Sequence, residues 1–478
     1  MAKRNCVKIA LVSPPPPLGA HVDYQNPLIG LAAMAAVLEK NGDQVAVVDC
    51  PRLDMTHEDL KREIARLEPD MVGITCVTTT FSSALQAARV IKEAYSRALI
   101  ALGGPHATFM DSQILSENPE VDIVVRGEGE QTVLELASHV SDSCLKELHE
   151  VAGITFRKNG QIVQTQNRPF IQNLDQLPFP AFKYFPLRKY RLFGKLNLPI
   201  ITSRGCSFQC AFCLVPQIAG NKFRARNPKN VVDELEWLRD AYGAAVFTFQ
   251  DETFTYDKKR ALEICEEIKK RNIGVPWDCQ TRVDQISKKL LVKMKNANCQ
   301  LVSYGVESGN QKILDAMKKG TTVEQNERAI RWTKEAGLSV AMSAIIGYPG
   351  ETIDTLEQTL DFIRRTEPDD VYLCLATPYP GTQLRSLLED LGWKMSTEWS
   401  HYEIRTPVFE NPLLPSGRIK ETREAFYNHF YSIPYVLRQS LKGTFYSQNM
   451  ARTAAHHLSW QIKVPSWISD NLKKLTRL

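Results

Sequence analysis

Three cysteines with a distinctive spacing lie near the middle of the chain. Cys206, Cys210 and Cys213 follow Gly205 in a CxxxCxxC arrangement, which puts three thiols on one short loop. A [4Fe–4S] cluster ordinarily takes four cysteine thiolates, so a loop with three leaves one iron open to chelate a small molecule. The alternative is a zinc site, but zinc would need a fourth His or Cys nearby, and the next cysteine downstream is Cys265. The spacing therefore predicts an iron–sulfur cluster with one reactive iron.

The same loop resembles a known signature. CxxxCxxC with an aromatic residue, Phe212, before the last cysteine is similar to the motif of the radical S-adenosylmethionine (SAM) superfamily. In that family the open iron is chelated by the amino and carboxylate groups of SAM. The resemblance implies reductive cleavage of SAM to a 5′-deoxyadenosyl radical, with an external one-electron donor of the flavodoxin or ferredoxin type.

Composition is that of an ordinary globular protein. The 478 residues are 43 % hydrophobic and 24 % charged, which predicts two or three domains. Eleven cysteines behind an N-terminus without a long apolar stretch predict a reducing, cytoplasmic location. The longest uncharged run, Met71 to Ala88, is too rich in Ser and Thr to span a bilayer. A net charge of only +5 and the lack of a binding motif argue against nucleic acid as a partner.

Residues 1–145 alternate short apolar runs with helical patterns. This order is typical of a doubly wound parallel sheet covered on both faces. Loops rich in Thr or Gly follow several of the strands, at the edge where open α/β sheets bind ligands. The expected strands are 7–13, 44–49, 71–76, 99–102 and 123–125, with an Ala-rich helix over 28–40.

These loops resemble the cobalamin-binding domain attached to many radical SAM enzymes. In such a domain Gly103 and Gly104 would let the backbone approach a flat macrocycle, and the hydroxyls of Thr78 and Thr79 would bond a nucleotide tail. The resemblance adds Glu128, in the third loop, to the expected contacts. The alternative is a flavodoxin-like domain without a ligand that only supports its neighbour.

One departure concerns the cobalt ligand. The Asp-x-His-x-x-Gly loop whose His ligates cobalt in mutases and methionine synthase is absent from this chain. His106 is the only histidine in the candidate loops, and a His in a Gly-Gly-Pro-His turn is more often a hydrogen-bonding residue. Cobalamin, if bound, is therefore expected to lack a histidine beneath cobalt, a state that suits methyl transfer.

A linker is expected over 146–198, followed by a second domain. The linker is expected to hold a hairpin that turns at Asn159-Gly160 and a stiff, extended crossing at Leu177 to Pro180. From 199 to 400 the pattern repeats strand then helix, which predicts a partial (β/α)6 barrel with ligands at the carboxyl ends of its strands. Residues 401–478 are expected to be mostly helical. The barrel strands are expected at 200–202, 246–249, 277–279, 301–304, 339–346 and 371–376.

The resemblance also implies that the acidic residues after the second barrel strand contact SAM. It places Phe212 beside the adenine, and it places Asp251 and Glu252 where the family has a Gly-Gly-Glu string that contacts the SAM amino group. The glycines of that string are absent here, which weakens the match for Glu252. The alternative is an ordinary salt bridge at the end of a strand.

Residues at the ends of three further strands are matched in the same way. Glu307 and Ser308 resemble the family's residues that contact the ribose and the carboxylate of SAM. Arg282 resembles a partner for the SAM carboxylate, and Gly347 to Gly350 resemble the segment whose backbone approaches the adenine. SAM carries an ammonium, a carboxylate and a sulfonium, and each charge needs a partner in a water-poor cleft.

The two resemblances together imply a cobalamin-dependent C-methyltransferase acting on an unactivated carbon, similar to the hopanoid methylases and antibiotic C-methylases. One alternative is a radical SAM cyclase or carbon–carbon coupling enzyme, similar to the anaerobic porphyrin cyclase or the tetraether lipid synthase. A third, from another class, is a cobalamin- or SAM-binding regulator, although a sensor needs no open iron. No catalytic side chain is assigned, and Cys279 and Cys374 are candidates only because they lie on predicted strands.

The C-terminal tail is basic and aromatic. From Leu437 onward there are seven Lys or Arg and one Asp, together with Trp460 and Trp467, and an aromatic-rich segment at 426–434 precedes them. Basic helices with aromatic residues are typical of membrane-surface elements, so peripheral membrane contact and a lipid substrate are expected. The alternative is a helical cap packed over the barrel.

Overall fold

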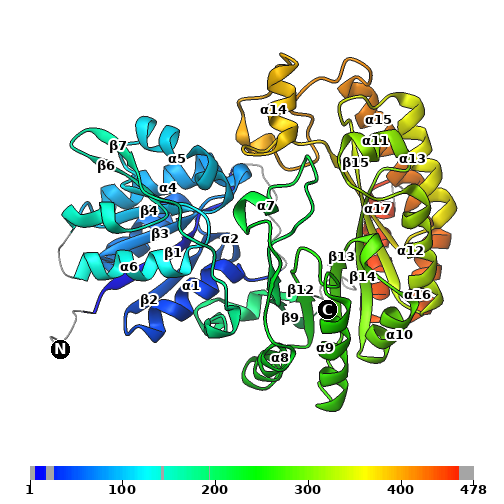
Figure 1. Cartoon of the computed structure of the whole chain (residues 1–478), viewed down its shortest axis with the longest axis horizontal. Coiled ribbons are helices and arrows are strands. Elements are labelled where there is room, and N and C mark those ends of the chain that lie inside the picture. The colour runs from blue at the N-terminus through cyan, green and yellow to red at the C-terminus, as the bar shows by residue number, and fades with distance from the viewer. Residues whose placement is uncertain (1–5, 18–25, 142–144, 193, 462–478) are drawn as a thin grey trace.

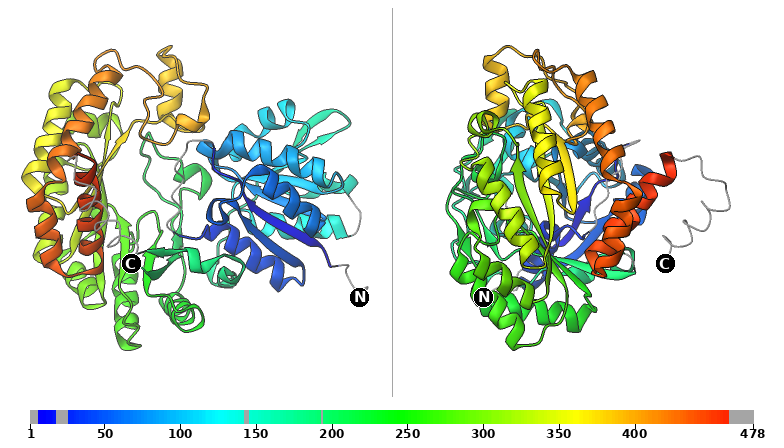
Figure 2. Two further views of the ribbon diagram at one scale, coloured as in Figure 1. Left: turned by 180° about the vertical axis from the view of Figure 1, so that it is seen from behind. Right: turned by 90° about the vertical axis from the view of Figure 1, so that its right-hand side faces the viewer.

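Two seven-stranded sheets, one in each half of the chain, organise the fold (Figure 1). The structure is a computed structural model that describes residues 6–17, 26–141, 145–192 and 194–461. The first sheet and its helices lie beside the open side of the second sheet, and the C-terminal helices pack on the second sheet (Figures 1 and 2).

The first sheet has the strand order β2-β1-β3-β4-β5 in parallel, which confirms the doubly wound prediction. Helices α1 and α6 pack on one face and α3, α4 and α5 on the other. Ligands bind this type of sheet at the carboxyl ends of its strands. The bounds are β1 (Lys8–Ser13), α1 (Ile29–Lys40), β2 (Gln44–Asp49), α2 (Cys50–Leu53), α3 (His57–Leu67), β3 (Met71–Thr75), α4 (Phe81–Ala94), β4 (Leu99–Gly103), α5 (Pro105–Glu117), β5 (Ile123–Val125) and α6 (Glu130–Ser141).

The expected hairpin forms, but as part of the first sheet. Strands β6 (Ile154–Lys158) and β7 (Gln161–Gln164) are joined by Asn159 and Gly160, both at positive φ, as a tight hairpin turn requires. Strand β6 pairs antiparallel with β5, which would otherwise be an open edge. The first sheet therefore extends beyond the expected boundary at residue 145, and the connecting segment begins only after β7.

The connecting segment is stiff and fastened to the first domain. It runs through three short 3-10 turns, η3 (Leu174–Gln176), η4 (Phe182–Tyr184) and η5 (Leu187–Lys189). The backbone N–H of Ala181 donates to the carbonyl oxygen of Ala32 in α1 at 2.9 Å, and the Tyr190 hydroxyl donates to buried Asp49. These contacts hold the chain where it enters the second domain.

The second sheet confirms the partial (β/α)6 barrel. Six parallel strands follow the order β9-β12-β13-β14-β15-β16, and β8 joins β9 antiparallel. Helices α10, α12 and α13 lie on the side away from the first domain (Figures 1 and 2). The bounds are β8 (Arg191–Leu192), β9 (Lys195–Ile200), β10 (Ser203–Arg204), α7 (Val215–Ile218), β11 (Arg224–Ala225), α8 (Pro228–Tyr242), β12 (Val246–Phe249), α9 (Lys258–Lys270), β13 (Trp277–Thr281), α10 (Lys288–Asn296), β14 (Cys299–Glu307), α11 (Gln311–Ala316), α12 (Val323–Glu335), β15 (Ser339–Ile346), α13 (Ile353–Thr366), β16 (Asp370–Leu375) and α14 (Gln383–Asp390).

The inner face of the half-barrel is apolar at one end and polar at the other. Near the amino ends of the strands, Val246, Leu301 and Ala341 are buried in one cluster with the C-terminal helix α17 (Phe445–Gln461). Because side chains alternate along a strand, the same face continues toward the carboxyl ends with polar or small residues such as Ser303 and Ser343. Helix α17 therefore fills the lower half of the barrel and leaves the polar end for ligands.

Helices α15 (Ser416–Phe430) and α16 (Ile433–Lys442) cover the edge strand β16. The Leu373 N–H donates to the Tyr427 hydroxyl at 2.9 Å, and the Leu373 carbonyl accepts from Arg423 Nε at 3.1 Å, which satisfies backbone groups left unpaired at the edge. Phe426 stacks on Phe430 with ring centroids 5.5 Å apart. The aromatic segment is thus a packing element, as the helical-cap alternative expected. No helix in the described part of the chain is long and apolar enough to cross a membrane.

The packing of α17 generates a pH prediction. Asp278 accepts hydrogen bonds from the Tyr446 hydroxyl and from Thr248 Oγ1, the latter at 2.9 Å, and burial raises its pKa to about 6. Since the folded state holds this proton more tightly than the unfolded state, stability should fall as the pH rises from about 4 to about 6. Asp278→Asn keeps an acceptor and removes the charge, so it should raise the stability at pH 7 by about 1–2 kcal/mol and flatten the profile.

The measurement is the thermal unfolding midpoint between pH 4.5 and 7.5. Tyr446→Phe serves as the control, since it removes one donor and should lower the midpoint at pH 7. A midpoint for Asp278→Asn that matches the natural chain at every pH would show that Asp278 is solvated.

Candidate functional site

The cysteine loop is held by backbone hydrogen bonds to two other segments of the chain. It begins at Gly205, whose φ is 87° and where a Cβ would lie only 2.3 Å from the Lys222 carbonyl oxygen, so the turn requires glycine. The N–H of Cys206 donates to Gly220 O at 3.0 Å and that of Ala211 to Met317 O at 2.9 Å. The three thiols are thus presented on a fixed loop beyond the carboxyl end of β9.

The surroundings of the thiols fit an anionic iron–sulfur cluster. Arg282 Nη1 lies 3.7 Å from Cys210 Sγ, and its guanidinium lies 3.7 Å from the centroid of the Phe208 ring. Burial raises the pKa of the Cys213 thiol to about 11, so an uncoordinated Cys213 keeps its proton until a metal displaces it. Three soft donors on one loop with a cation beside them match a cluster that has one open iron.

A buried ion pair lies next to the loop. Glu307 Oε1 accepts from Lys319 Nζ at 2.8 Å, and Lys319 Nζ is 6.0 Å from the centroid of the Phe212 ring. Glu307 has φ 66°, a conformation that costs free energy in a residue other than glycine and is typical of functional sites. The structure thus brings the predicted residues Phe212, Arg282 and Glu307 together around the cysteines. It adds Lys319, which no motif marks in the sequence.

Two predicted residues point elsewhere. Asp251 is fully buried, and its carboxylate accepts from Thr202 Oγ1 at 2.7 Å and from the hydroxyl of Ser203. Ser308 is also fully buried, and its hydroxyl lies 3.1 Å from Thr359 Oγ1 behind the sheet. Both side chains fasten strand ends, so their predicted roles as direct SAM contacts do not match the geometry.

The neighbouring residues Glu252, Gly347 and Gly350 do reach the carboxyl edge. Glu252 lines the large cavity described below, and burial raises its pKa to about 7. The glycines have φ of 80° and 89° in the turn after β15, where the Gly347 N–H donates to the buried carboxyl of Glu351. Gly347 is buried, and a Cβ there would lie 2.9 Å from Ile419 Cδ1, whereas Gly350 is exposed with open space where a Cβ would be.

A cavity of about 660 Å³ opens at the carboxyl edge of the first sheet. It runs between the sheet and helices α1 and α6, and Gly103 and Gly104 lie at its edge. Gly104 has φ 112°, and a Cβ there would lie 2.6 Å from the Cys76 carbonyl oxygen. A pocket of this size, lined mostly by apolar side chains and glycines at the carboxyl edge of a parallel sheet, is where this type of fold binds ligands. The residues present therefore fit a large ligand with a flat part and a buried tail, such as cobalamin.

His106 and the hydroxyl residues of the loop after β3 lie outside this cavity, and His106 makes a hydrogen bond, as expected of a histidine in such a turn. His106 is buried between the rings of Phe81 and Trp399, with centroids at 4.3 and 4.9 Å, and its Nδ1 is 3.2 Å from Thr78 Oγ1. Burial lowers the His106 pKa to about 4. Neither Thr78 nor Thr79 borders the cavity, so their expected hydrogen bonds to a nucleotide tail do not match its position. None of the described residues that line the cavity is a histidine.

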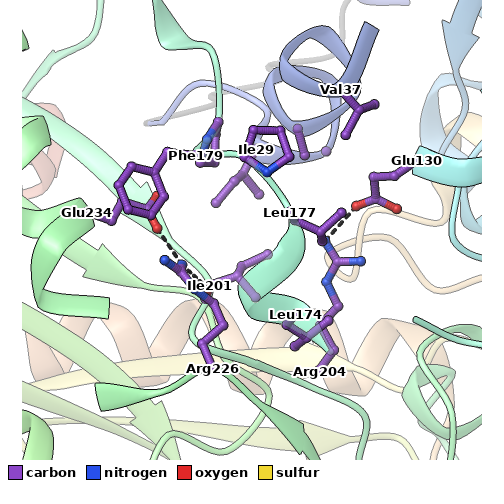
Figure 3. Close-up of a pocket in the computed structure, with 14 residues that line it drawn as sticks. Ile29, Val37, Glu130, Leu174, Leu177, Phe179, Ile201, Arg204, Arg226 and Glu234 are labelled. Atoms are coloured by element: carbon purple, nitrogen blue, oxygen red, sulfur yellow. Dashed lines mark hydrogen bonds and ion pairs between the residues drawn. The ribbon is translucent and has the colours of Figure 1, made fainter. Parts of the chain in front are cut away.

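An ionic network joins the cavity to the cysteine loop. Arg204, two residues before Cys206, donates to Glu128 at 3.1 Å and to Glu130 at 2.6 Å, and Arg224 donates to Glu128 at 2.9 Å. Figure 3 shows the Arg204–Glu130 pair at one side of a small pocket between α1 and the connecting segment. Glu128 was expected as a cofactor contact, and the structure makes it a link between domains that also borders the cavity.

The second domain lines part of the mouth of the cavity. Ile201, Arg204, Gln250 and Glu252, from the carboxyl edge of the half-barrel, line the same space as the glycines of the first domain. Arg204 before the cysteine loop and Ala219 after it both line the cavity, so a ligand there would lie beside the base of the loop that would hold the cluster.

Comparisons with known proteins agree with this arrangement. Residues 200–363 match the radical SAM superfamily, and residues 15–137 match the B12 binding domain. The chain is 34 % identical to an uncharacterised methyltransferase, PH0819, of Pyrococcus horikoshii over 90 % of this chain and 94 % of that one. It is 33 % identical to the anaerobic magnesium-protoporphyrin IX monomethyl ester cyclase of Rubrivivax gelatinosus over 86 % of this chain and 75 % of that one.

A solved structure has the same fold. The radical SAM methyltransferase TsrM of Kitasatospora setae, determined with cobalamin and a [4Fe–4S] cluster bound, superimposes with a TM-score of 0.74 at 18 % identity and covers 95 % of this chain and all of that one. The matched domains, the two long alignments and the shared architecture lead to one assignment. The chain belongs to the radical SAM superfamily of enzymes, among the members that carry an N-terminal B12-binding domain.

Proposed function

We propose that this chain is a cobalamin-dependent radical SAM methyltransferase that methylates an unactivated carbon. The observation that carries the proposal is that Arg204 and Ala219, which flank the cysteine loop of the second domain, also line the cavity of the first domain. Bound at these two places, cobalamin would supply a methyl group, and SAM on the cluster would supply the means to abstract a hydrogen atom. Two cofactors that act on one carbon must lie this close.

The chain's own residues would hold and orient these groups. Cys206, Cys210 and Cys213 would bind the cluster, and Arg282 would offset the negative charge beside Cys210. At the end of β14, Glu307 of the buried pair would bind a positive charge of SAM and Lys319 its negative charge. We propose that cobalamin binds without a histidine ligand to cobalt, because the Asp-x-His-x-x-Gly string is absent from the sequence.

A radical cyclase is the second candidate. The similarity to the Rubrivivax cyclase is almost as great as that to the Pyrococcus methyltransferase, at 33 and 34 % identity. Both functions would use the same cysteine loop, so the fate of the methyl group distinguishes them.

The two cofactor sites should be separable by mutation. Replacing Cys206, Cys210 and Cys213 together with Ala should abolish the iron content and brown absorption of the anaerobically reconstituted protein and leave bound corrinoid in place. Gly103→Phe should do the reverse, because its Cβ would meet nothing closer than Val125 at 3.8 Å and the ring would occupy the cavity. Metal analysis and absorption spectra measure both. Cys6→Ala, at an exposed cysteine, is the control.

The state of cobalt gives an independent reading of the same sample. Electron paramagnetic resonance of the cob(II)alamin form should show no nitrogen splitting. Retention of iron by the triple variant, or unchanged corrinoid in Gly103→Phe, would contradict the assignment of the sites.

Methyl transfer itself is tested in cells. Mass spectrometry of extracts from strains with and without the gene should show a product that exceeds its precursor by one methyl group, and isotopically labelled methionine should label that group. A pair of compounds that differs by a ring or a carbon–carbon bond, with no methyl gained, would favour the cyclase or coupling function.

We further propose an external electron donor of the flavodoxin or ferredoxin type.

We also propose weak contact of the C-terminal tail with anionic membranes. Residues 462–478, which include Trp467, lie outside the described residues and carry four Lys or Arg. Since each basic residue near such a surface contributes about 1 kcal/mol, a chain ending at Gln461 should bind anionic liposomes at least about tenfold more weakly in a sedimentation assay. This truncation keeps the core residues of α17. Equal sedimentation of the two chains would remove the reason to propose a lipid substrate.

A further inference from the structure

Two arginines stand beside the carboxyl end of the edge strand β16. Arg423 Nε donates to the Leu373 carbonyl at 3.1 Å, and the Leu375 N–H donates to the carbonyl of Ile404, next to Arg405, at 2.8 Å. Leu373 and Leu375 are two residues apart, so these bonds place the two arginines along one short stretch of strand. Cys374, the residue between, faces the inner side of the half-barrel.

This part of the inner face is open. Cys374 is half-buried, and Tyr372, two residues earlier on the same face, is 55 % exposed. Toward the amino ends, by contrast, the face is covered by α17. The open stretch lies at the end of the half-barrel where the cysteine loop and the cavity also lie, and ligands bind at this end in such barrels.

The loop that carries Arg405 is held in a strained form. Ile404 has φ 66°, and a left-handed conformation is unfavourable for a β-branched residue. Glu403 enforces it, since its carboxylate accepts from the Arg405 N–H at 2.6 Å and the Thr406 N–H at 3.2 Å. The Tyr379 hydroxyl donates to the Tyr402 carbonyl at 2.8 Å and fastens the start of the loop. Strain maintained by so many contacts is typical of functional segments.

The charges at this place do not cancel. Within the described residues, the guanidinium of Arg405 has no hydrogen bond or ion pair, and Arg423 uses only Nε. Glu403 is the acid beside Arg405, whereas Glu398 and Glu410, the other acids between α14 and α15, accept from Ser400 and from the Ser416 N–H. Glu307, whose charge also acts on the Cys374 thiol, is paired with Lys319 at 2.8 Å. One cation therefore remains in excess, with donors in the fork geometry that binds carboxylate or phosphate.

We propose that Arg405 and Arg423 bind the acidic group, a carboxylate or phosphate, of the substrate, with Cys374 beside it on the inner face of β16. The inference rests on the proposed function in one respect, since it names the substrate class of that reaction. An anionic substrate anchored here would extend along the polar inner face toward the cysteine loop. Arg405 is then the residue that selects acidic over neutral molecules.

The test uses Cys374 as a reporter and requires no turnover. Iodoacetate and iodoacetamide carry the same reactive carbon, but only iodoacetate is an anion. The anaerobic protein loaded with cluster and cobalamin is treated with each reagent, and peptide mass spectrometry gives the alkylation rate at Cys374 and at exposed Cys6. The ratio of the iodoacetate rate to the iodoacetamide rate should be about tenfold higher at Cys374 than at Cys6, because an excess cation attracts the anion.

Arg405→Gln should bring the ratio at Cys374 down to that at Cys6, whereas Arg405→Lys should keep part of the difference. Inorganic phosphate should slow the reaction of Cys374 with iodoacetate in the natural chain and have no such effect in Arg405→Gln. If Arg405→Gln fails to fold, the Arg405→Lys variant and the phosphate protection decide. Equal ratios at the two cysteines, or no alkylation of Cys374 by either reagent, would overturn the proposal and leave the methyltransferase assignment standing.

Discussion

The contact between Arg204 and two glutamates of the first domain is the interaction on which the site depends. All of these side chains are largely buried, and removing one partner from a buried ion pair typically costs about 3–5 kcal/mol because the other charge is left without compensation. Glu128 also accepts the N–H of Ile171 at 2.8 Å, so the connecting segment meets the two domains at the same carboxylate. This carboxylate therefore helps to fix the position of the cavity relative to the cysteine loop, together with the contacts that fasten the connecting segment to the first domain.

The elements of the fold could be predicted because their signals are local. Strands such as Gln44–Asp49 and Ser339–Ile346 were expected at the residues where they occur, since a short apolar run followed by a helical period marks a βα unit. The hairpin at Asn159 and Gly160 was also expected, but its membership of the first sheet depends on the free edge of β5, which lies about thirty residues earlier. Pairing partners of this kind leave no mark in a sequence.

The site was predicted only in part, for the same reason. The cysteines form a recognisable motif and Arg282 closely follows a predicted strand, so both could be found from the sequence. Lys319 and Arg204 belong to the site because of ion pairs with residues distant in the chain, Glu307 and Glu130. Asp251 and Glu252 show where prediction of the site from the sequence fails. They are adjacent, yet one is fully buried behind the strand and the other borders the cavity, and only the place where the strand ends decides between them. The aromatic segment at 426–434 shows the same limit, since Tyr427 of this segment bonds to β16 and Phe426 stacks on Phe430, contacts that its composition alone does not reveal.

The position of α17 has a consequence for how the protein is made. Domains generally fold in order as the chain leaves the ribosome. Val246, Leu301 and Ala341 are buried by a helix that starts only at Phe445, so the sheet is synthesised well before its apolar lining can be covered. Until then both the apolar and the polar part of the inner face are exposed to solvent. Since α17 covers the apolar part only when it has been made, a nascent chain should depend on chaperones most strongly in the interval between β16 and α17.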